Sequence, residues 1–324
     1  MVNHIVVIKQ FILSSLSFLV SLLHVYYTSS IKRVNLKAHF FLKKMSHFNT
    51  LCLSGGGVRG YELLGAIAYL QEILDFNDIN NFIGTSVGSL VGYLLAIGYT
   101  ALEILILTNS SKIFDRLKTF NVMKMIQDGG AVEFTSIVEM VETLTIKKIG
   151  KLINLRQLKD DHGKTLKIIT YNATKREKEV ISPETHPDMP CICAIRMSCT
   201  LPFIFQPYEY NGCLYLDGGL VENLPISQVE DPQSTLAINL KPNPPSLEQE
   251  SLYTNFNPVK YGVNILNIPI DAAIRRSVEK ANELKIQLIE VTSGTKGFEF
   301  DLNTTQRLDL FSEGYNAAKE QYLK

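Results

Sequence analysis

Nine residues, Phe82 to Leu90, constrain the fold of this chain more than any other stretch. They read FIGTSVGSL and contain the pattern G-T-S-V-G with Ser86 at its centre. An apolar run precedes the pattern, and a helix-like run, VGSLVGYLLAIGY, follows it. A strand that turns sharply into a helix is the context that a nucleophile elbow needs. Gly84 and Gly88 have no Cβ, so the backbone can turn tightly and lift the serine hydroxyl clear of its neighbours.

The same pattern is compatible with a simple Gly/Ser turn, because GxSxG is short and occurs often by chance. In the catalytic interpretation, the helix that begins at Ser86 directs its free N–H groups and its positive dipole end toward a developing oxyanion. The choice between the two depends on what the rest of the chain supplies.

A glycine loop precedes this stretch. The buried-strand candidate TLCLS runs into GGGVRG, and a helical pattern follows. Three consecutive glycines, Gly55, Gly56 and Gly57, let successive backbone N–H groups converge on an anion, as an oxyanion hole requires. Arg59 adds a positive charge near the loop, or it pairs with an acidic residue and braces the loop. Gly60 completes the motif.

The loop also matches GxGxxG, the dinucleotide-binding fingerprint. Asp75 and Asp78 lie at about the right distance for a ribose contact, but no clear second strand separates them from the glycines. A nucleotide-binding loop also leaves Ser86 and a later Asp-Gly-Gly unexplained. We therefore favour the acyl-transfer interpretation over a dinucleotide site, and a merely structural glycine turn is the third alternative.

A candidate base for the serine lies far along the chain. Asp217 ends a short strand candidate and is followed by Gly218 and Gly219. Ligands bind at strand ends in α/β sheets, although Asp-Gly is also a favourite of simple Asx turns. A serine hydroxyl needs a base to become nucleophilic. None of the six histidines follows His186, so the hydrolase order Ser, Asp, His cannot be completed.

The two histidines nearest to the motifs are weak alternatives. His162 lies in the polar turn KDDHGK and His186 in a Pro-flanked loop, and both are typical of surface residues. The best base is therefore Asp217, acting directly on Ser86 as a dyad. Partial desolvation would raise the pKa of this carboxyl toward a useful range.

The remaining pattern alternates strands with helices, which indicates an α/β fold with a central, mainly parallel sheet flanked by helices. Residues 101–157 are mostly helical in pattern, with a break at Asp128 to Gly130 and an uneven apolar surface that either seats an acyl chain or is ordinary packing. Further strands are expected at 165–172, 179–182, 235–240 and 285–292, and further helices at 271–284 and near the carboxyl terminus, with a mobile loop at 241–260.

Composition excludes some classes of partner. The formal net charge is zero, so no basic field exists to recruit nucleic acid. The five cysteines are odd in number and irregularly spaced, which argues against a disulfide scaffold. Cys191 and Cys193 have no second pair or histidine at ligand spacing, so no metal site is expected.

The amino-terminal stretch Phe11 to Tyr27 is apolar and long enough, at the short limit, to span a bilayer. We expect residues 1–46 to be a single-pass membrane anchor with a basic linker, and residues 47–324 to be the catalytic domain. A cleaved signal peptide and a start at Met45 remain alternatives. The excess of basic residues after the stretch favours a cytoplasmic catalytic domain: Lys32, Arg33, Lys37, Lys43 and Lys44.

The ordered motifs GGGVRG, GTSVGS and DGG resemble those of the patatin-like phospholipase family. Two further stretches, AIRMSCTLPFIFQP and DGGLVENLP, look like that family's ASxAxPxxFxP and DG[AG]xxxNxP runs. The similarity covers Thr50 to Tyr322. The chain departs from the family pattern at Cys199 and Thr200, which follow Ser198 where small residues are usual, and this departure bears on acyl-chain preference.

The resemblance implies Ser86 as nucleophile, Asp217 as base, and the three loop glycines with Arg59 as the oxyanion hole or its support. It also implies an α/β sandwich, an acyl-enzyme released by water, and no metal or other cofactor. We therefore expect a lipid acyl hydrolase of the phospholipase A or lysophospholipase type, with a lipid substrate and a membrane as partners. The alternatives are a neutral-lipid lipase or acyltransferase with the same dyad, and a catalytically silent membrane-bound module.

Overall fold

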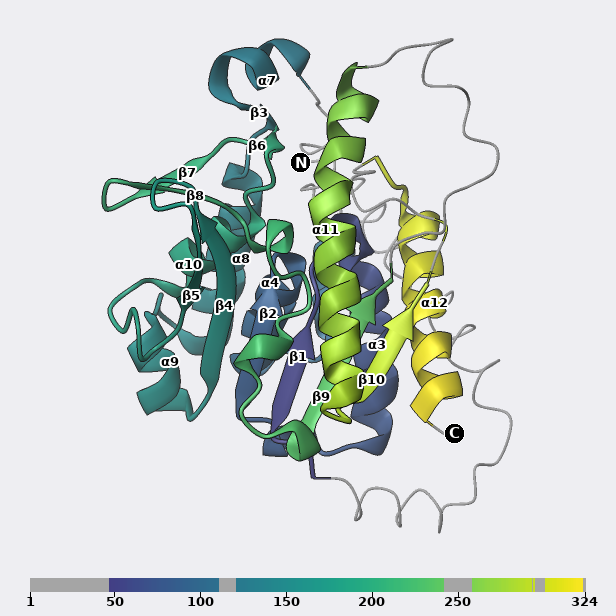
Figure 1. Cartoon of the computed structure of the whole chain (residues 1–324). Helices are drawn as coiled ribbons and strands as arrows, with labels where there is room; N and C mark the ends of the chain where they lie inside the picture. Colours follow the sequence, from purple (N-terminus) through teal and green to yellow (C-terminus); the bar gives the residue numbers. More distant parts are fainter. Residues whose placement is uncertain (1–46, 111–120, 242–257, 293, 295–300, 323–324) are drawn as a thin grey trace, which may run out of the picture. The chain divides into compact units, whose positions relative to one another are not determined.

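The computed structural model describes residues 47–110, 121–241, 258–292, 294 and 301–322 (Figure 1). Residues Ser46–Lys324 form one compact unit. Residues 1–46, with the expected anchor and basic linker, lie outside the described residues, as does most of the expected mobile loop at 241–260.

A central sheet organises this unit. Its strand order is β10-β9-β1-β2-β4-β8-β7, with β5 beside β4, which makes eight strands among the described residues. The run from β10 to β4 is parallel, whereas β5, β7 and β8 pair antiparallel. The strands are β1 (Thr50–Leu53), β2 (Asn81–Thr85), β4 (Thr165–Asn172), β5 (Glu177–Ile181), β7 (Tyr208–Tyr210), β8 (Cys213–Asp217), β9 (Thr235–Leu240) and β10 (Gln287–Val291).

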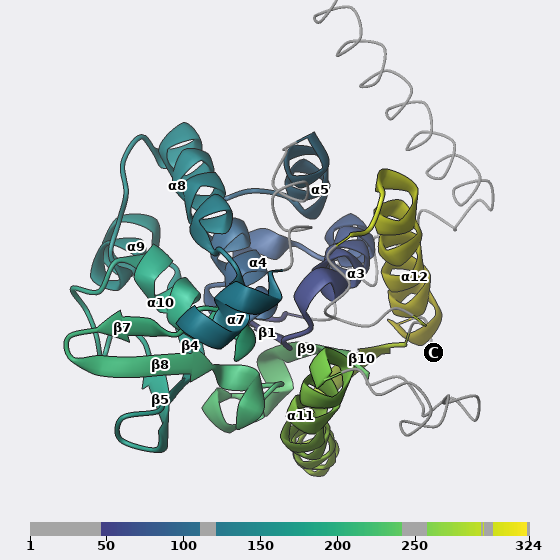
Figure 2. The ribbon, with the colours of Figure 1, turned by 90° about the horizontal axis from the view of Figure 1, so that it is seen from above.

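Helices cover both faces of the sheet, which confirms the expected α/β sandwich with a mainly parallel sheet. Figure 2 shows α11 on one face and α3 and α4 on the other. A small second sheet pairs β3 (Gly130–Val132) with β6 (Phe203–Phe205). The α-helices are α3 (Gly60–Ile73), α4 (Val87–Ala96), α5 (Ala101–Ser110), α7 (Val122–Asp128), α8 (Thr135–Ile149), α9 (Leu155–His162), α10 (Cys191–Cys199), α11 (Pro258–Glu283) and α12 (Thr304–Tyr322).

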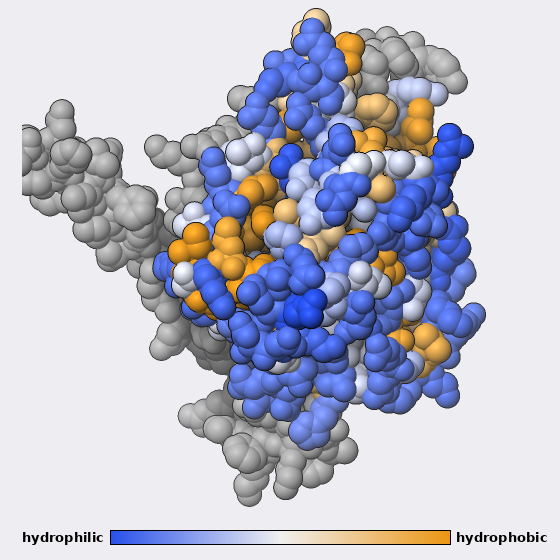
Figure 3. Space-filling model, turned by 90° about the vertical axis from the view of Figure 1, so that its left-hand side faces the viewer, coloured by the Kyte–Doolittle hydropathy of each residue, from blue (hydrophilic) through white to orange (hydrophobic). Residues whose placement is uncertain are grey.

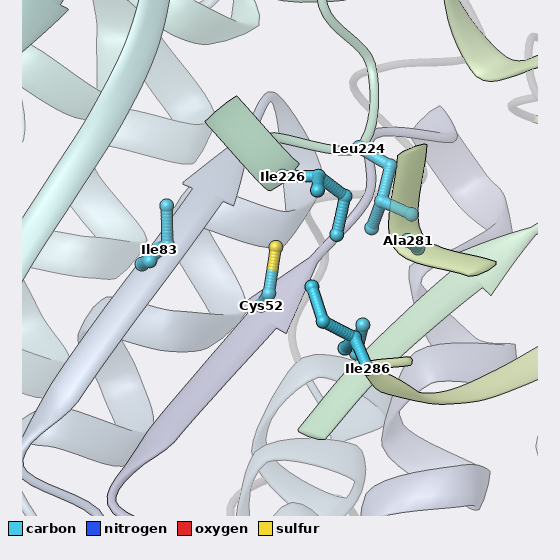
Figure 4. Close-up of a cluster of buried hydrophobic side chains, with 7 residues drawn as sticks. Cys52, Ile83, Leu224, Ile226, Ala281 and Ile286 are labelled. Carbon is cyan, nitrogen blue, oxygen red and sulfur yellow. The ribbon is translucent and has the colours of Figure 1, made fainter. Parts of the chain in front are cut away.

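The central strands are continuous apolar runs because both of their faces are covered. Every residue of β1 and β9 is buried. On the α11 side, Cys52 of β1 and Ile83 of β2 lie near Ala281 of α11 in one apolar cluster (Figure 4). Leu224 and Ile226, from the chain after β8, belong to the same cluster. This core fixes the chain that follows Asp217 against the middle of the sheet.

The last helix, α12, packs directly on α3. A Cβ built on Gly65 would lie 1.9 Å from the carbonyl oxygen of Phe311, and one built on Gly314 would lie 1.9 Å from that of Glu62. Each helix therefore has a glycine at the point where its backbone meets the backbone of the other helix. The rings of Tyr69 and Tyr315 meet edge to face beside them, with centroids 5.4 Å apart.

Several boundaries differ from the sequence-based expectations. The break at Asp128 to Gly130 is the end of α7 and the start of β3, with Gly129 in the left-handed region at φ 77°. Helix α11 begins at Pro258 rather than Asp271 and includes Pro269. Its first turns are rich in Pro, Asn and Gly, which favour loops, and this composition concealed the helix.

Within the described residues, no single helix is long and apolar enough to cross a membrane. The pair Val87–Ala96 and Ala101–Asn109 passes the test of length and composition together, but the two helices are bent by 117°. Helix α4 is largely buried inside the unit, as expected of a core helix.

Candidate active site

Ser86 occupies the turn between β2 and α4 in a strained conformation, with φ 52° and ψ −128°. Positive φ is uncommon for a residue with a Cβ and is often found at functional sites. Gly84 and Gly88 must be glycines because the neighbouring backbone segments approach them closely. A Cβ on Gly84 would lie 2.6 Å from the carbonyl carbon of Gly88. One on Gly88 would lie 2.5 Å from the carbonyl oxygen of Leu53. The helix thus sits directly on the backbone of β1 and β2.

A second serine stabilises this turn. The backbone N–H of Ser86 donates to Ser198 Oγ at 2.8 Å, and Ser198 Oγ donates to the carbonyl oxygen of Ile169 at 2.6 Å. Ser198 lies on α10 and is fully buried. Sequence reasoning did not identify this role, and its only signal was the likeness of AIRMSC to a family stretch. Ser198 therefore holds the strained elbow against β4.

Strand β4 brings Asp217 to the elbow. Its first half pairs with β2, up to Thr85 opposite Ile169, and its second half pairs with β8, from Asp217 opposite Thr170. Because β5 occupies the other edge of β4, β2 and β8 share one edge end to end. Ser86 follows Thr85 in sequence, so this register places Asp217 next to it.

The two side chains are in direct contact. Ser86 Oγ donates a hydrogen bond to Asp217 Oδ2 at 2.6 Å, and the Gly219 N–H donates to Asp217 Oδ1 at 2.7 Å. Asp217 is 4% exposed. Burial raises its pKa to about 6, although the hydrogen bonds from Ser86 and Gly219 oppose this shift. This carboxylate is therefore a base with a pKa near neutrality, which suits proton transfer.

The chain after Asp217 also holds the glycine loop. A Cβ on Gly218 would lie 2.2 Å from the carbonyl oxygen of Ile169, so this turn passes tightly over β4. The Gly55 N–H donates to the carbonyl oxygen of Asn223 at 3.0 Å, and Asn223 Nδ2 donates to the carbonyl oxygen of Gly55 at 3.3 Å. Gly55 was expected among the oxyanion donors. Its N–H is instead engaged in the bond to Asn223, so the residue anchors the loop.

Two other loop amides have no such partner. Among the described residues, no acceptor is recorded for the backbone N–H groups of Gly56 and Gly57. Gly57 has φ 58° and lines the same pocket as Ser86. Gly60, the last glycine of the motif, starts α3 so close to α4 that a Cβ would lie 2.5 Å from Val87 Cγ2. Gly57 can thus offer an amide donor beside the serine, and the Gly56 amide is the second candidate.

Arg59 has the bracing role rather than that of a donor to an oxyanion. Its Nε and Nη2 donate to the two carboxylate oxygens of Glu62, at 2.9 and 2.8 Å. Its Nη1 donates to the carbonyl oxygen of Lys241 at 2.6 Å, and Nη2 also donates to that of Val291 at 3.2 Å. The guanidinium is buried and ties the start of α3 to the ends of β9 and β10.

An apolar pocket of about 130 Å³ lies beside Ser86. Tyr61 and Leu64 of α3 and Leu90 of α4 line it, and α5 and α8 contribute Ile104 and Ile137. The wall next to Ser86 includes Cys199, one of the two residues that depart from the family pattern. The helical region after Ala101 thus helps to line the site, and the pocket has the chemistry to hold a hydrocarbon chain.

The alternative bases are elsewhere. His186 contacts Thr185 and Glu179, and His162 ends α9. Within the described residues, no group of three or more His, Cys, Asp or Glu side chains could hold a metal ion. Of the candidate bases among the described residues, Asp217 is the one in contact with Ser86.

The chain is similar in sequence to one described protein family and to two viral proteins. A family model described as "Patatin-like phospholipase" matches residues 51–229, more than half of the 324 residues. "Probable lipid hydrolase 463L" of Invertebrate iridescent virus 6 is 37% identical over 57% of this chain and 64% of that protein. "Uncharacterized protein R571" of Acanthamoeba polyphaga mimivirus is 28% identical over 86% of this chain and 95% of that protein.

A solved structure has the same fold. The crystal structure of VipD from Legionella pneumophila superposes with a TM-score of 0.51 and 18% sequence identity, over 85% of this chain and 66% of that chain. The chain spans slightly less than two thirds of VipD and of the viral lipid hydrolase. At this identity the likeness concerns the fold alone.

Proposed function

The chain belongs to the patatin-like phospholipase family, and from this premise we propose that it is a lipid acyl hydrolase working through a Ser86–Asp217 dyad. Its substrates are fatty-acyl esters of phospholipids or lysophospholipids. The observation that carries the proposal is the 2.6 Å hydrogen bond from Ser86 Oγ to Asp217 Oδ2 in a buried site. The name of the viral relative, a probable lipid hydrolase, supports the same class of reaction.

In the first half-reaction, Ser86 Oγ attacks the ester carbonyl carbon while Asp217 Oδ2 accepts the hydroxyl proton. The carbonyl oxygen becomes the oxyanion of a tetrahedral intermediate and accepts hydrogen bonds from the N–H groups of Gly56 and Gly57. The intermediate collapses, the bond to the leaving alcohol breaks, and Asp217 returns the proton to that alcohol. An acyl ester on Ser86 remains.

In the second half-reaction, a water molecule takes the position of the alcohol. Asp217 accepts one water proton as the water oxygen attacks the acyl carbon, and the same two amides stabilise the second oxyanion. Collapse breaks the bond to Ser86 Oγ, which recovers its proton from Asp217. The products are a free fatty acid and the original enzyme. Each amide donor to an oxyanion is typically worth roughly 3 kcal/mol in the transition state.

A lipid substrate is supported by the pocket, whose lining from α3, α4, α5 and α8 is mainly apolar. A hydrocarbon chain gains free energy there by leaving water. A neutral-lipid lipase or an acyltransferase would use the same dyad. Incubation of the protein with mixed phospholipids, triacylglycerol and an acceptor alcohol separates these activities, because a transferase releases an ester of the alcohol and a lipase prefers the triacylglycerol.

A fluorophosphonate probe tests whether the site is chemically competent. We expect covalent labelling of the full chain at Ser86, because the probe reacts with serines that have an adjacent base. The Ser86→Ala variant should not be labelled. Ser234→Ala is the control, because Ser234 precedes β9 and bonds to Asp231, so the nucleophile and its turn remain unchanged. Absence of labelling in the folded wild-type chain would support a catalytically silent module instead.

The membrane anchor at Phe11 to Tyr27 remains a proposal from the sequence. It predicts that the full chain sediments with membranes, whereas a chain beginning at Met45 does so less. It also predicts that the catalytic domain is protected from protease added outside intact cells.

A further inference from the structure

Three large apolar side chains are exposed beside the pocket. Met123 and Ile126, on α7, are 61% and 70% exposed, and Phe203 of β6 is 47% exposed. Phe203 also has φ 67°, a strained conformation for a bulky residue. We call these three residues the mouth surface. Sequence analysis placed Met123 and Ile126 in a region that either seats an acyl chain or packs in the core, but both face solvent.

The mouth surface is continuous with the wall of the pocket. Strands β3 and β6 pair in parallel, with Gly130 opposite Phe203 and Val132 opposite Phe205. Phe134, two residues after β3, meets Phe205 edge to face with ring centroids 5.0 Å apart, and both rings line the pocket. The segment formed by α7, β3 and β6 therefore contributes one set of side chains to the pocket wall and another set to the mouth surface.

The charged side chains of α7 and β3 that the structure describes all have polar partners, and they carry no basic excess. Lys124, between the two exposed residues of α7, forms an ion pair with Glu133. Asp128, at the end of α7, accepts a hydrogen bond from Gln206 Nε2 at 3.2 Å. Lys124 is thus neutralised by Glu133, whereas Asp128 keeps its negative charge, so these residues offer no unpaired cation to an anionic lipid.

A second exposed apolar stripe lies on α11, at the same end of the sheet as α7 (Figure 1). Tyr261 and Ile265, one turn apart on α11, are 47% and 46% exposed, and this helix has no acidic residue before Asp271. Figure 1 shows α7 and the first turns of α11 at the end toward which the parallel strands point. In Figure 3, hydrophobic atoms lie among hydrophilic ones at this upper end.

We propose that the mouth surface, together with the start of α11, is the face that rests on a lipid bilayer while one acyl chain passes into the pocket. This inference rests on the proposed function, since it assumes a lipid substrate. Hydrocarbon chains reside in bilayers, and a pocket with large apolar side chains exposed at its rim can receive one without exposing it to water. Because the described residues of α7 and β3 carry no basic excess, the bilayer surface that fits is zwitterionic rather than anionic, and attachment should be insensitive to salt.

The chain has no tryptophan, so a single introduced one reports only on its own site. We would place it at Ile126, at Tyr261 or at Ile146, in the full chain carrying Ser86→Ala. Ile146 is 51% exposed near the end of α8 and provides the matched control. Each variant is mixed with phosphatidylcholine vesicles, with and without brominated acyl chains, at low and high salt.

With vesicles, the Ile126→Trp and Tyr261→Trp emission should shift to the blue and be quenched by bromine, at either salt concentration, whereas Ile146→Trp should do neither. The proposal would be overturned if the emission of Ile126→Trp did not shift and was not quenched with vesicles. It would also be overturned if bromine quenched only Ile146→Trp, or if the protein did not bind vesicles. A blue shift at 126 that rises with protein concentration without lipid would also overturn it, because the surface would then bind a second copy.

An activity measurement separates failure of docking from failure of the chemistry. In Met123→Ser/Ile126→Ser, hydrolysis of phosphatidylcholine vesicles should fall by about tenfold or more, as expected when two large side chains lose an apolar environment. Hydrolysis of a water-soluble short-chain ester should stay unchanged. The control Ile146→Ser/Leu152→Ser should retain both activities. Equal loss on both substrates, or no loss on vesicles, contradicts the docking surface, whereas an inactive wild-type chain contradicts the proposed function.

Discussion

At the scale of single residues, we expect burial of the Asp217 carboxyl to have opposite effects on catalysis and on stability. Burial raises its pKa to about 6, which makes the carboxylate a better base for Ser86. The same desolvation penalises the ionised form, which the folded protein must carry at neutral pH. The account therefore predicts a pH dependence for each property, with opposite signs.

Activity should depend on ionised Asp217. As the pH falls through about 6, the carboxyl becomes protonated and can no longer accept the Ser86 proton. We expect kcat/KM for a soluble ester to be level above this pH and to fall about tenfold per pH unit below it, because the ionised fraction falls by that factor. A pH–rate profile on the full chain measures this. A level profile down to about pH 4.5 would indicate a base with an ordinary pKa.

Stability should change in the other direction. The pKa of Asp217 lies above its ordinary value of 3.8, so the folded state holds its proton more tightly than the unfolded state, and stability falls as pH rises from about 4 to 6. Asp217→Asn removes this penalty. An amide can still accept from Gly219 and donate to Ser86 Oγ. We expect the variant to be more stable by up to about 3 kcal/mol at neutral pH, with the difference vanishing near pH 4.

Urea unfolding of the wild-type chain and of Asp217→Asn at both pH values measures this difference. Asp309→Asn is the control, since that residue lies on α12 away from the site. An asparagine variant that is less stable than the wild type at neutral pH would show that the carboxylate is stabilised rather than penalised in its site.

At the residue scale, the sequence predicts some parts of the candidate site and not others. The glycine motifs and the Asp-Gly-Gly stretch predicted that Ser86 and Asp217 meet, and the structure brings them into hydrogen-bond contact. They could not distinguish Gly55 from its neighbours, because the acceptor of its N–H is Asn223 O, set by a loop far along the chain. The partners of Arg59 at Lys241 and Val291 depend on the sheet order in the same way.

At the scale of elements, the strand pattern was informative because buried parallel strands are continuous apolar runs. The positions of β1 and β9 follow from it closely, whereas β4 was expected from the alternation of its residues. The start of α11 was missed, since its Pro- and Asn-rich turns lack a helical composition. The role of Ser198 was missed because a hydroxyl that bonds one backbone N–H across the fold leaves no local pattern.

The contact between α3 and α12 predicts an effect of added volume. In Gly314→Ala, the new Cβ would lie 1.9 Å from the carbonyl oxygen of Glu62, so the helices must separate. We expect the protein to lose about 1–3 kcal/mol of unfolding free energy, as in other overpacked sites. Gly262→Ala, on α11 with open space around its Cβ, is the matched control and should be neutral or slightly stabilising. Equal stability of the two variants would show that this helix contact is loose.

At the scale of the whole molecule, the unit extends beyond the residues that match the family model. That match ends at residue 229, before β9, β10, α11 and α12. Strands β9 and β10 nevertheless complete the sheet beside β1, and Arg59 of the glycine loop bonds to the carbonyl oxygens of Lys241 and Val291, which follow β9 and end β10. The proposed site thus depends on the later part of the chain, and it should be tested in a protein that includes β9, β10, α11 and α12.

The central claim is that Ser86 and Asp217 act as one catalytic unit. Its most direct test is the release of fatty acid from phospholipid by the full chain, by Ser86→Ala, by Asp217→Asn and by the double variant. We predict that each single change abolishes release to within a few-fold of background and that the double change costs no more than either alone, because the two groups share one step. Wild-type release by either folded single variant would contradict the account.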